Sequence, residues 1–530
     1  MGAVADVVLF NAVLHTMDAA NPAATALAID DGALVYVGTD DGARAFIGDS
    51  TQVVDLAGAT VLPGLIDAHT HLVTSGAEAE DAALGDCKTV DDLLAVVRSF
   101  GAAHPTGWLL GGGYDVSAFE GHLTRQQLDG VVSDRPVFMG AVDGHTAWVN
   151  SEALRVAGIT AKSKDVPGGV IDRDADGVPT GMVRENALEL LYAVMPEYPA
   201  DQLDRGLDAA QAEAHSFGIT SAIEPGGEEF VMETYGRAER AGTLDLRVRA
   251  AMIVDGPRGV ASAIKARKTY DSNRLAVDAV KLFLDGVIES ETALMLEPYA
   301  DGRNGEALFT DDALRRTAQK ADRAGLQLHA HALGDGAVHQ MLDALAWLET
   351  TEGPRDRRPL LAHLEVIDPA DVPRFAALGA YADFQPLWAY PDSYIRDLTW
   401  PVIGPERSRW LYPIGSVDRA GGVIVGGSDW SVSSMNPFEA IEVAVTRQDP
   451  DEPGDVLVAE ERVTVDRMLR AYTIDAARAM FLESEVGSIT VGKRADLIVV
   501  DADPYTVKPH ALSDVHVTQT WFDGRVVFAR

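Results

Sequence analysis

The sequence predicts an α/β protein, a TIM-like (β/α)8 barrel with a small β-sandwich built from both chain ends and a lid insertion after the first barrel strand. Three observations support this fold class. Strand-like runs alternate with helical stretches through the middle of the chain, short alternating strands occur at both ends, and one segment is too long to be a simple connection. A chain of 530 residues is longer than one ordinary core requires, which agrees with a large barrel that has additional layers.

The two chain ends, residues 1–60 and 483–530, are predicted to form one composite β-sandwich. The N-terminal part contains short apolar runs such as 33–37, bounded by Asp-Gly turn signals. The C-terminal part repeats this pattern around an Asp-Gly turn at 523–524. Strands from the two ends can therefore pair with each other.

Residues 61–482 are predicted to form the barrel. Apolar runs of strand length alternate there with helical stretches, as expected for βα units around a parallel sheet. Eight runs qualify, which is the number that a closed barrel needs. They are 60–66, 220–223, 246–253, 279–284, 327–331, 360–363, 381–384 and 423–427.

Residues 73–185 are predicted to form an inserted lid. The segment is too long for one βα loop, and it carries its own helix and strand patterns and glycine turns at 111–113 and 167–169. Since βα loops leave a barrel at the face where barrel enzymes keep their chemistry, the lid is expected to cover the active site.

The composition excludes several classes of partner. The chain has 81 acidic and 44 basic residues and a formal charge of −37, so it would repel nucleic acids and anionic membranes. The single cysteine, Cys87, can form neither an internal disulfide nor a cysteine-rich metal site. The N-terminus has no signal-peptide pattern and no apolar run of membrane length follows, so the expected location is cytoplasmic.

Histidines and an aspartate at strand ends predict a metal site. His69 and His71 end an apolar strand two positions apart, so both imidazoles point to the same side. An isolated pair of this kind is equally well explained as two ordinary polar residues. Further strand ends carry His329 and His331, His363, and Asp429. Zinc and related metals bind imidazole nitrogen and carboxylate oxygen, so the whole set favours a metal site.

Lys281 is a second unusual feature of the predicted barrel. It lies in an apolar strand whose neighbours Val280 and Leu282 point to the opposite face, so its side chain is expected to point into the barrel. The alternatives are a structural ion pair or a lysine that reaches solvent from the strand end. A carbamate on the amine would convert this cation into an anion able to bridge two metal ions.

Several stretches together resemble the amidohydrolase superfamily, and in particular its YtcJ-like branch (amidohydrolase family 3), which includes N-substituted formamide deformylases. The resemblance covers nearly the whole chain. The stretches that carry it are PGLIDAHTH, DGHTAWVNSEAL, DGVPTGMVRENA, VKLFLDG, HAHALGDGAV, LAHLEVI, GGSDWSV and VGKRADLIVVDADP.

The resemblance implies a binuclear centre of divalent metal ions. The implied metal ligands are His69, His71, Lys281, His331, His363 and Asp429. Lys281 would bridge the two ions through a carbamate derived from CO2, with zinc as the first expectation and manganese, iron or cobalt as alternatives. His329 is interpreted as a neighbour, because the family pattern places the ligand directly before Ala-x-Gly-Asp.

The predicted function is hydrolysis of a C–N bond in a small amide-type or formamide-type substrate. A hydroxide shared by two metal ions forms near neutral pH, because metal binding lowers the pKa of water from roughly 16 toward 7. The predicted catalytic residues are Asp429, which carries the proton of the attacking water to the leaving nitrogen, Lys281, which joins the metal ions, and His145. His145 lies in the lid, where it could bond the substrate carbonyl or oxyanion. The alternative is a packing residue at a capped helix start, but its place in a family-like stretch and in a barrel loop favours the functional interpretation.

Aromatic residues near strand ends and in the lid suggest an apolar substrate pocket. They are His122, Trp148, Phe384, Trp388, Tyr390 and Trp430. Most aromatic residues are simply core, so only Trp430, beside Asp429, is predicted to lie near the site. Glu185 could face the pocket, or it could serve a helix N-terminus.

Other functions stay open. A mononuclear deaminase of the same superfamily would have no use for a bridging Lys281, whereas an esterase or lactonase could use the same metal hydroxide. A non-catalytic barrel regulator is a different class, and the presence of all six implied ligands argues against it. A homodimer is expected only because symmetric dimers are the commonest oligomers.

Overall fold

Eight parallel strands form the central sheet of the computed structural model, which describes residues 4–119, 123–166 and 168–530. Their order in the sheet is the same as in the chain. The strands are β8 (Leu65–Asp67), β15 (Ile219–Gly227), β16 (Arg247–Ile253), β17 (Leu275–Phe283), β18 (Gln327–Ala332), β19 (Leu360–His363), β20 (Tyr381–Phe384) and β21 (Val423–Gly426). The α/β fold class predicted from the sequence is confirmed.

Backbone hydrogen bonds bring the two edges of this sheet together just beyond β8 and β21. The Ala68 amide donates to the Gly426 carbonyl over 3.0 Å, and the Asp429 amide donates to the His69 carbonyl over 2.7 Å. Gly427 permits this approach, since a Cβ at that position would lie 2.6 Å from the Cβ of His69. The sheet is therefore a nearly closed barrel.

The predicted strand at 60–66 is divided between two sheets. β7 (Thr60–Pro63) pairs with strands of the chain ends, and β8 pairs with β15 of the barrel. Gly64 lies at the change of direction, where a Cβ would come within 2.3 Å of Thr220 Oγ1. The change of sheet is thus fixed by a close approach that only glycine permits.

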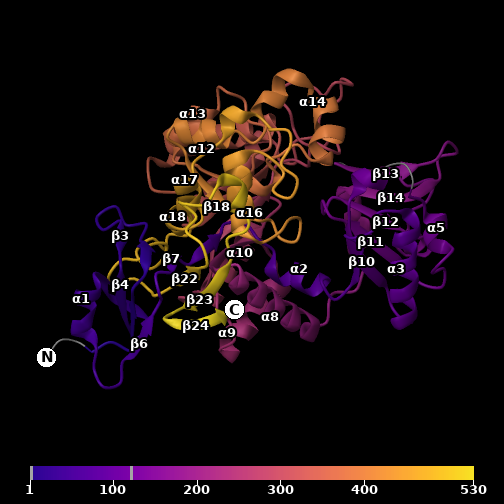
Figure 1. The fold of residues 1–530 in the computed structure, drawn as a ribbon. Helices are drawn as coiled ribbons and strands as arrows, with labels where there is room; N and C mark the ends of the chain where they lie inside the picture. The colour runs from indigo at the N-terminus through magenta and orange to yellow at the C-terminus, as the bar shows by residue number, and fades with distance from the viewer. Residues whose placement is uncertain (1–3, 120–122, 167) are drawn as a thin grey trace.

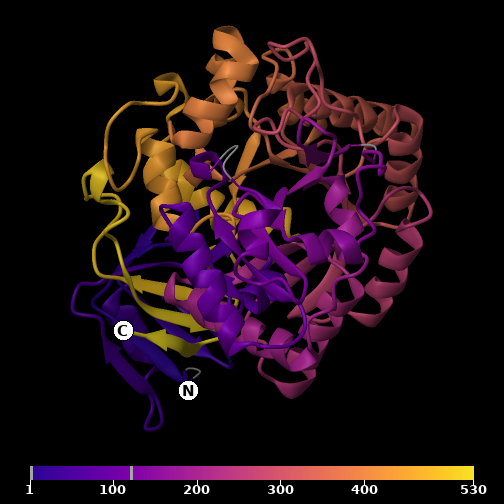
Figure 2. The same ribbon diagram turned by 90° about the vertical axis from the view of Figure 1, so that its right-hand side faces the viewer.

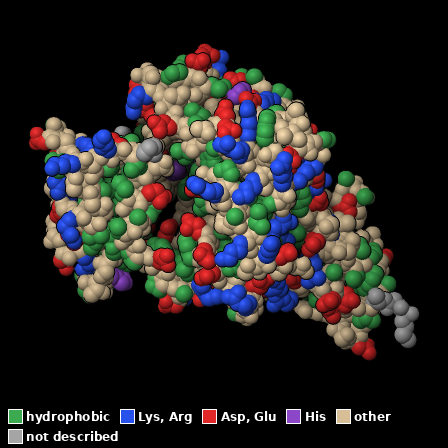
Figure 3. Space-filling view, turned by 180° about the vertical axis from the view of Figure 1, so that it is seen from behind, with side chains coloured by type: hydrophobic (Ala, Val, Ile, Leu, Met, Phe, Trp, Pro, Cys, Tyr) green, Lys and Arg blue, Asp and Glu red, His purple; other side chains and the backbone are tan. Residues whose placement is uncertain are grey.

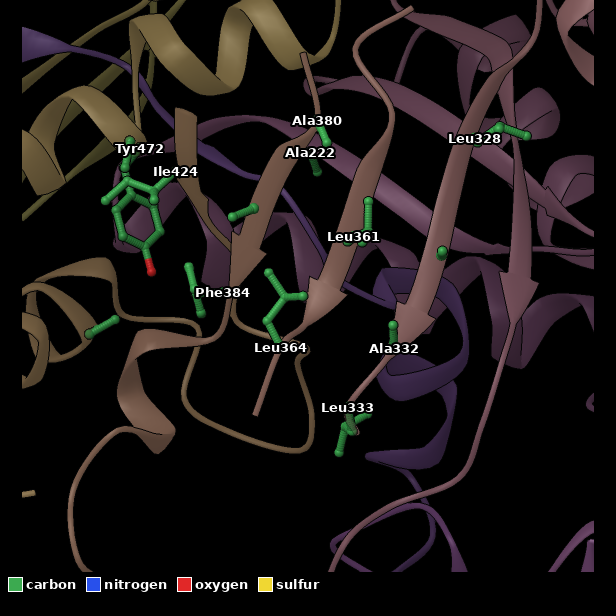
Figure 4. Close-up of a cluster of buried hydrophobic side chains, with 14 of the residues drawn as sticks. Ala222, Leu328, Ala332, Leu333, Leu361, Leu364, Ala380, Phe384, Ile424 and Tyr472 are labelled. Atoms are coloured by element: carbon green, nitrogen blue, oxygen red, sulfur yellow. The ribbon is translucent and has the colours of Figure 1, made fainter. Parts of the chain in front are cut away.

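Helices cover the outside of the barrel (Figures 1 and 2). They include α8 (Ala200–Ser216), α9 (Glu229–Ala241), α10 (Val260–Thr269), α11 (Asp311–Arg323), α12 (Asp335–Glu352), α13 (Val372–Leu378), α15 (Ile414–Arg419), α17 (Val465–Ala471) and α18 (Ile474–Ala479). α11 illustrates their pattern: Thr310 caps its first turn, and buried Leu314, Ala318 and Ala321 recur along one face. Figure 4 shows part of the apolar core, with Leu328, Leu361 and Ile424 on three barrel strands.

The chain ends share a six-stranded sheet. Its order is β24 (Arg525–Ala529), β23 (Val517–Phe522), β22 (Leu497–Val500), β7, β2 (Val13–His15) and β3 (Ala23–Ala24). A second, four-stranded sheet contains β5 (Ala33–Gly38), β4 (Ala26–Asp30), β1 (Val7–Phe10) and β6 (Gln52–Asp55). Leu14, Leu27 and Leu497 from the two sheets belong to one buried cluster, so these sheets pack face to face.

A third sheet belongs to the segment between β8 and β15. Its order is β13 (Gly169–Arg173), β14 (Pro179–Glu185), β12 (Thr146–Val149), β11 (Val137–Ala141), β10 (Leu109–Tyr114) and β9 (Ala82–Ala83). With α3 (Val90–Ala103) it encloses its own apolar cluster. This unit lies in front of the ring of barrel helices in Figure 2, and Figure 3 shows a hollow between it and the barrel with acidic side chains at its rim. Within the described residues, no helix is both long and apolar enough to span a bilayer.

Candidate metal and active site

The six predicted metal ligands lie at or near the carboxyl ends of barrel strands. His69 and His71 follow β8, and Asp429 follows β21. Lys281 lies in β17, His331 in β18, and His363 ends β19. Five of the six residues are buried, whereas the side chain of His71 is 29% exposed. The sequence positions therefore converge on one end of the barrel.

Contacts link these side chains into one group. Lys281 Nζ lies 3.2 Å from His69 Nε2, and His71 Nε2 lies 3.2 Å from Asp429 Oδ1. Asp429 also lies 3.7 Å from His69 Nε2 and 3.9 Å from His363 Nδ1. The rings of His331 and His363 are 4.7 Å apart between centroids. His69, His363 and Asp429 each offer a ligand atom, and these atoms lie within 4.8 Å of one another.

Burial controls the charge of these groups. Burial, followed by the charge of Lys281 or a neighbouring histidine, holds the pKa of His69, His331 and His363 well below the ordinary value, so these imidazoles are neutral. Burial lowers the pKa of Lys281 to about 8, although nearby carboxylates oppose the change. Burial also disfavours charge on His71, but hydrogen bonds to Asp429 and Glu224 outweigh it and raise its pKa to about 10.

Unusual backbone conformations occur at the same place. His363 and Asp429 have φ values of 78° and 52°, in the left-handed region that residues other than glycine rarely adopt. Each such residue costs about 1–3 kcal/mol, and this kind of strain is typical of functional sites.

Comparison with known proteins gives the family. A model of the amidohydrolase family matches residues 52–528. This chain belongs to the amidohydrolase family. The membership predicted from the motifs is confirmed.

Individual relatives of this amidohydrolase agree with the assignment. Protein LONG AFTER FAR-RED 3 of Arabidopsis thaliana is 31% identical over 95% of this chain and 88% of its own length. N-substituted formamide deformylase of Arthrobacter pascens is 28% identical over 99% of this chain and 98% of its own. The crystal structure of an uncharacterized metal-dependent hydrolase from Pyrococcus horikoshii has a TM-score of 0.77 at 25% identity, covering 95% of this chain and 99% of that one.

The segment between β8 and β15 brings His145 to the site of this amidohydrolase. The rings of His145 and His331 are 5.9 Å apart between centroids. Glu185 Oε2 lies 2.8 Å from His145 Nδ1, and the Thr292 hydroxyl donates to Glu185 Oε1 over 2.6 Å. Burial disfavours charge on His145, but Glu185 outweighs this effect and raises its pKa to about 9. Glu185 thus faces the site, and Thr292, which no sequence pattern distinguishes, joins the end of β14 to the loop after β17.

The predicted aromatic residues lie in different places. Trp388 stacks on His363 with a centroid distance of 5.7 Å, and the Trp430 carbonyl accepts from the His71 amide over 3.2 Å. Trp148, in contrast, is buried in the apolar cluster between the third sheet and α3, and its indole donates to the Thr124 carbonyl. His122 lies outside the described residues.

Three acidic residues of the site were not anticipated. Asp383 on β20 contacts His69, and Glu224 on β15 contacts His71 at 3.4 Å and accepts from the Tyr235 hydroxyl. Asp67 accepts from the His69 amide and from the Ser428 amide and hydroxyl, so it ties the ends of β8 and β21 together. The available signal was weak: each is a single acid within or beside an apolar strand.

Proposed function

We propose that this amidohydrolase is a metal-dependent enzyme that hydrolyses the C–N bond of an N-substituted amide or formamide. The observation that carries the proposal is the grouping of Lys281, His69 and Asp429 at the end of the barrel, with contacts of 3.2 and 3.7 Å. The Arthrobacter pascens relative, whose name specifies N-substituted formamides, supports this choice of substrate class.

The donor atoms fit divalent metal ions. Neutral imidazole nitrogen and carboxylate oxygen are ligands that zinc accepts, and His69, His363 and Asp429 offer them within 4.8 Å of one another. We assign the following residues to a centre of two zinc ions, or of manganese, iron or cobalt: His69, His71, Lys281, His331, His363 and Asp429. When bound, the ions would act as Lewis acids and lower the pKa of a water molecule.

The role proposed for Lys281 is to join the two ions as a carbamate. The free amine attacks CO2, a C–N bond forms, one proton leaves the nitrogen, and the product carries a negative charge. Only the neutral amine can react, and the pKa of about 8 makes a substantial neutral fraction available near physiological pH. A buried cation is thereby replaced by an anion that suits a site for two cations.

Asp429 is proposed to hold and move a proton. Its two oxygens reach both His71 and His363, so the carboxylate lies between the two halves of the ligand set. It would take the proton of the attacking water and give it to the nitrogen as the C–N bond breaks.

His145 is proposed to bind the carbonyl oxygen of the substrate. Its Nδ1 is held by Glu185, so the ring is fixed and Nε2 is the group that would donate. The pKa of about 9 keeps the ring protonated at neutral pH, which favours an oxygen on which negative charge develops.

The test is turnover of matched substrates by metal-loaded protein. N-formyl and N-acetyl amines, the corresponding esters, a lactone and a purine nucleoside would be offered, and released amine, acid, alcohol or ammonia measured by mass spectrometry. Amine release that disappears in the Lys281→Ala and Asp429→Asn proteins supports the proposal. Ester-only turnover would reassign the enzyme as an esterase, and ammonia release as a deaminase.

A further inference from the structure

We propose that Asp383 is the positioning residue for His69: it holds the imidazole proton on Nδ1 and so leaves Nε2 free to bind a metal ion. This inference rests on the proposed metal site. Asp383 belongs to a group of polar side chains inside the barrel, next to the proposed ligands His331 and His363 and further from the carboxyl ends of the strands.

The group consists of His69, His329 and Asp383, all of which are fully buried. His69 Nδ1 lies 3.2 Å from Asp383 Oδ2 and 3.0 Å from His329 Nε2. The third contact, between His329 Nε2 and Asp383 Oδ2, measures 3.4 Å. His329 pairs with Lys281 and lies two residues before His331, and Asp383 pairs with Ala362, one residue before His363. His329 and Asp383 therefore lie beneath the proposed ligands, and His69 belongs to both groups.

The chemistry of imidazole makes the partner of Nδ1 decisive. His69 Nε2 faces Lys281 and Asp429, so Nε2 is the nitrogen that would bind metal. A neutral imidazole carries one proton, and a metal ion on Nε2 requires that proton on Nδ1. The Nδ1–H group then needs an acceptor, and a carboxylate also increases the basicity of the coordinating nitrogen.

Asp383 is a better candidate for this role than His329. A carboxylate oxygen accepts more strongly than a neutral imidazole nitrogen, although both lie within reach of His69 Nδ1. If His329 donated to Nδ1 instead, the proton of His69 would be forced onto Nε2 and would compete with the metal.

The contacts of Asp383 differ from those of a structural carboxylate. Among the described residues, Asp383 Oδ1 has no hydrogen-bond partner, and the contacts of Asp383 with His69 and His329 both use Oδ2. Asp67, two positions before His69, uses both carboxylate oxygens to join the ends of β8 and β21. It accepts from the backbone amide of His69 and not from its ring. Asp67 is therefore a natural control for Asp383.

The experiment measures metal binding without substrate. The dissociation constants of zinc and cobalt would be determined by competition with a chelator in the wild type and in the Asp383→Asn, Asp383→Ala and Asp67→Asn proteins, and the visible spectrum of bound cobalt recorded for each. We expect metal binding roughly 10- to 100-fold weaker and an altered cobalt spectrum in both Asp383 variants. Asp67→Asn, which loosens the tie between β8 and β21 but leaves the ring contacts of His69 in place, should lower the melting temperature of the metal-free protein and weaken metal binding less than either Asp383 variant.

Three results would overturn the inference. They are unchanged affinity and spectrum in folded Asp383 variants, an equal loss of affinity in Asp67→Asn, and a third metal ion per chain that disappears with Asp383. The His329→Gln protein covers the case in which the Asp383 variants do not fold: retained affinity supports the inference, and lost affinity contradicts it. Since no turnover is measured, a failure of the proposed amide hydrolysis would leave this result unaffected.

Discussion

Replacement of Gly427 by alanine is the sharpest test of how the barrel builds its site. A Cβ at this position would lie 2.6 Å from His69 Cβ and 2.7 Å from the His69 nitrogen. Carbon atoms pack at about 3.5–4.0 Å, so the strand ends must separate by about 1 Å. Neither end can move freely, because the Gly427 amide donates to Phe384 and the Asp429 amide donates to His69.

The expected loss from Gly427→Ala is larger in activity than in stability. Overpacking of this kind costs about 1–3 kcal/mol of unfolding free energy. A misplacement of about 1 Å at reacting groups can lower a rate roughly 100-fold. In this variant the displacement would increase the distance between His69 and Asp429. Thermal unfolding, metal content and kcat would be measured together. Gly454→Ala is the matched control, because a Cβ on that exposed glycine would come no closer than 3.6 Å to a neighbouring atom. Normal kcat and metal content in a destabilised Gly427→Ala protein would refute the reasoning.

Three further results are expected. Asp429→Asn should lower kcat about 10²- to 10⁴-fold with little change in melting temperature, since a proton acceptor is lost and the shape is kept; near-normal kcat would remove the assigned role. Recovery of activity by metal-free protein, given metal at a fixed concentration of dissolved CO2, should be about 25-fold faster at pH 8.5 than at pH 6.5, because the neutral amine fraction of Lys281 rises through a pKa of about 8. A rate independent of pH or CO2 would argue against a carbamate. Glu185→Gln should move the alkaline loss of activity to lower pH. Glu185 raises the pKa of His145 to about 9, and without its charge burial would lower that pKa. An unchanged pH profile would show that a protonated His145 is not needed.

The sequence predicts the barrel well because its signals are local. Each barrel strand contains a short apolar run, and the proposed ligands lie near the end of such a run or just after it. The division of 60–66 between two sheets could not be predicted, since β7 and β8 are both fully buried and have the same apolar pattern. Only the close approach of Gly64 to Thr220 distinguishes them.

The rest of the site depends on contacts that no local pattern reveals. Asp383 is 314 positions away from His69 in the chain, and the two meet only because the barrel curves back on itself. In its strand, Asp383 resembles an ordinary acid between apolar neighbours. Trp148 is a similar case: it packs in one apolar cluster with Leu93 and Val97 of α3, whereas its neighbours Ala147 and Val149 belong to another, and the sequence does not tell which face of the strand enters which cluster.

The composite sheet of the chain ends contributes to the site through the first histidine pair. A single residue, Gly64, separates β7 of that sheet from β8, whose end carries His69 and His71. The Gly64 amide donates to the Asp496 carbonyl over 2.8 Å, and the Ile66 amide donates to the Tyr472 carbonyl over 2.7 Å. The C-terminal part of the chain thus holds the amino end of β8, while the hydrogen bond between Ser428 and Asp67 ties its carboxyl end to β21. Since a short strand of three residues has few ladder bonds of its own, these ties at both ends are what keep the histidine pair in register with Asp429.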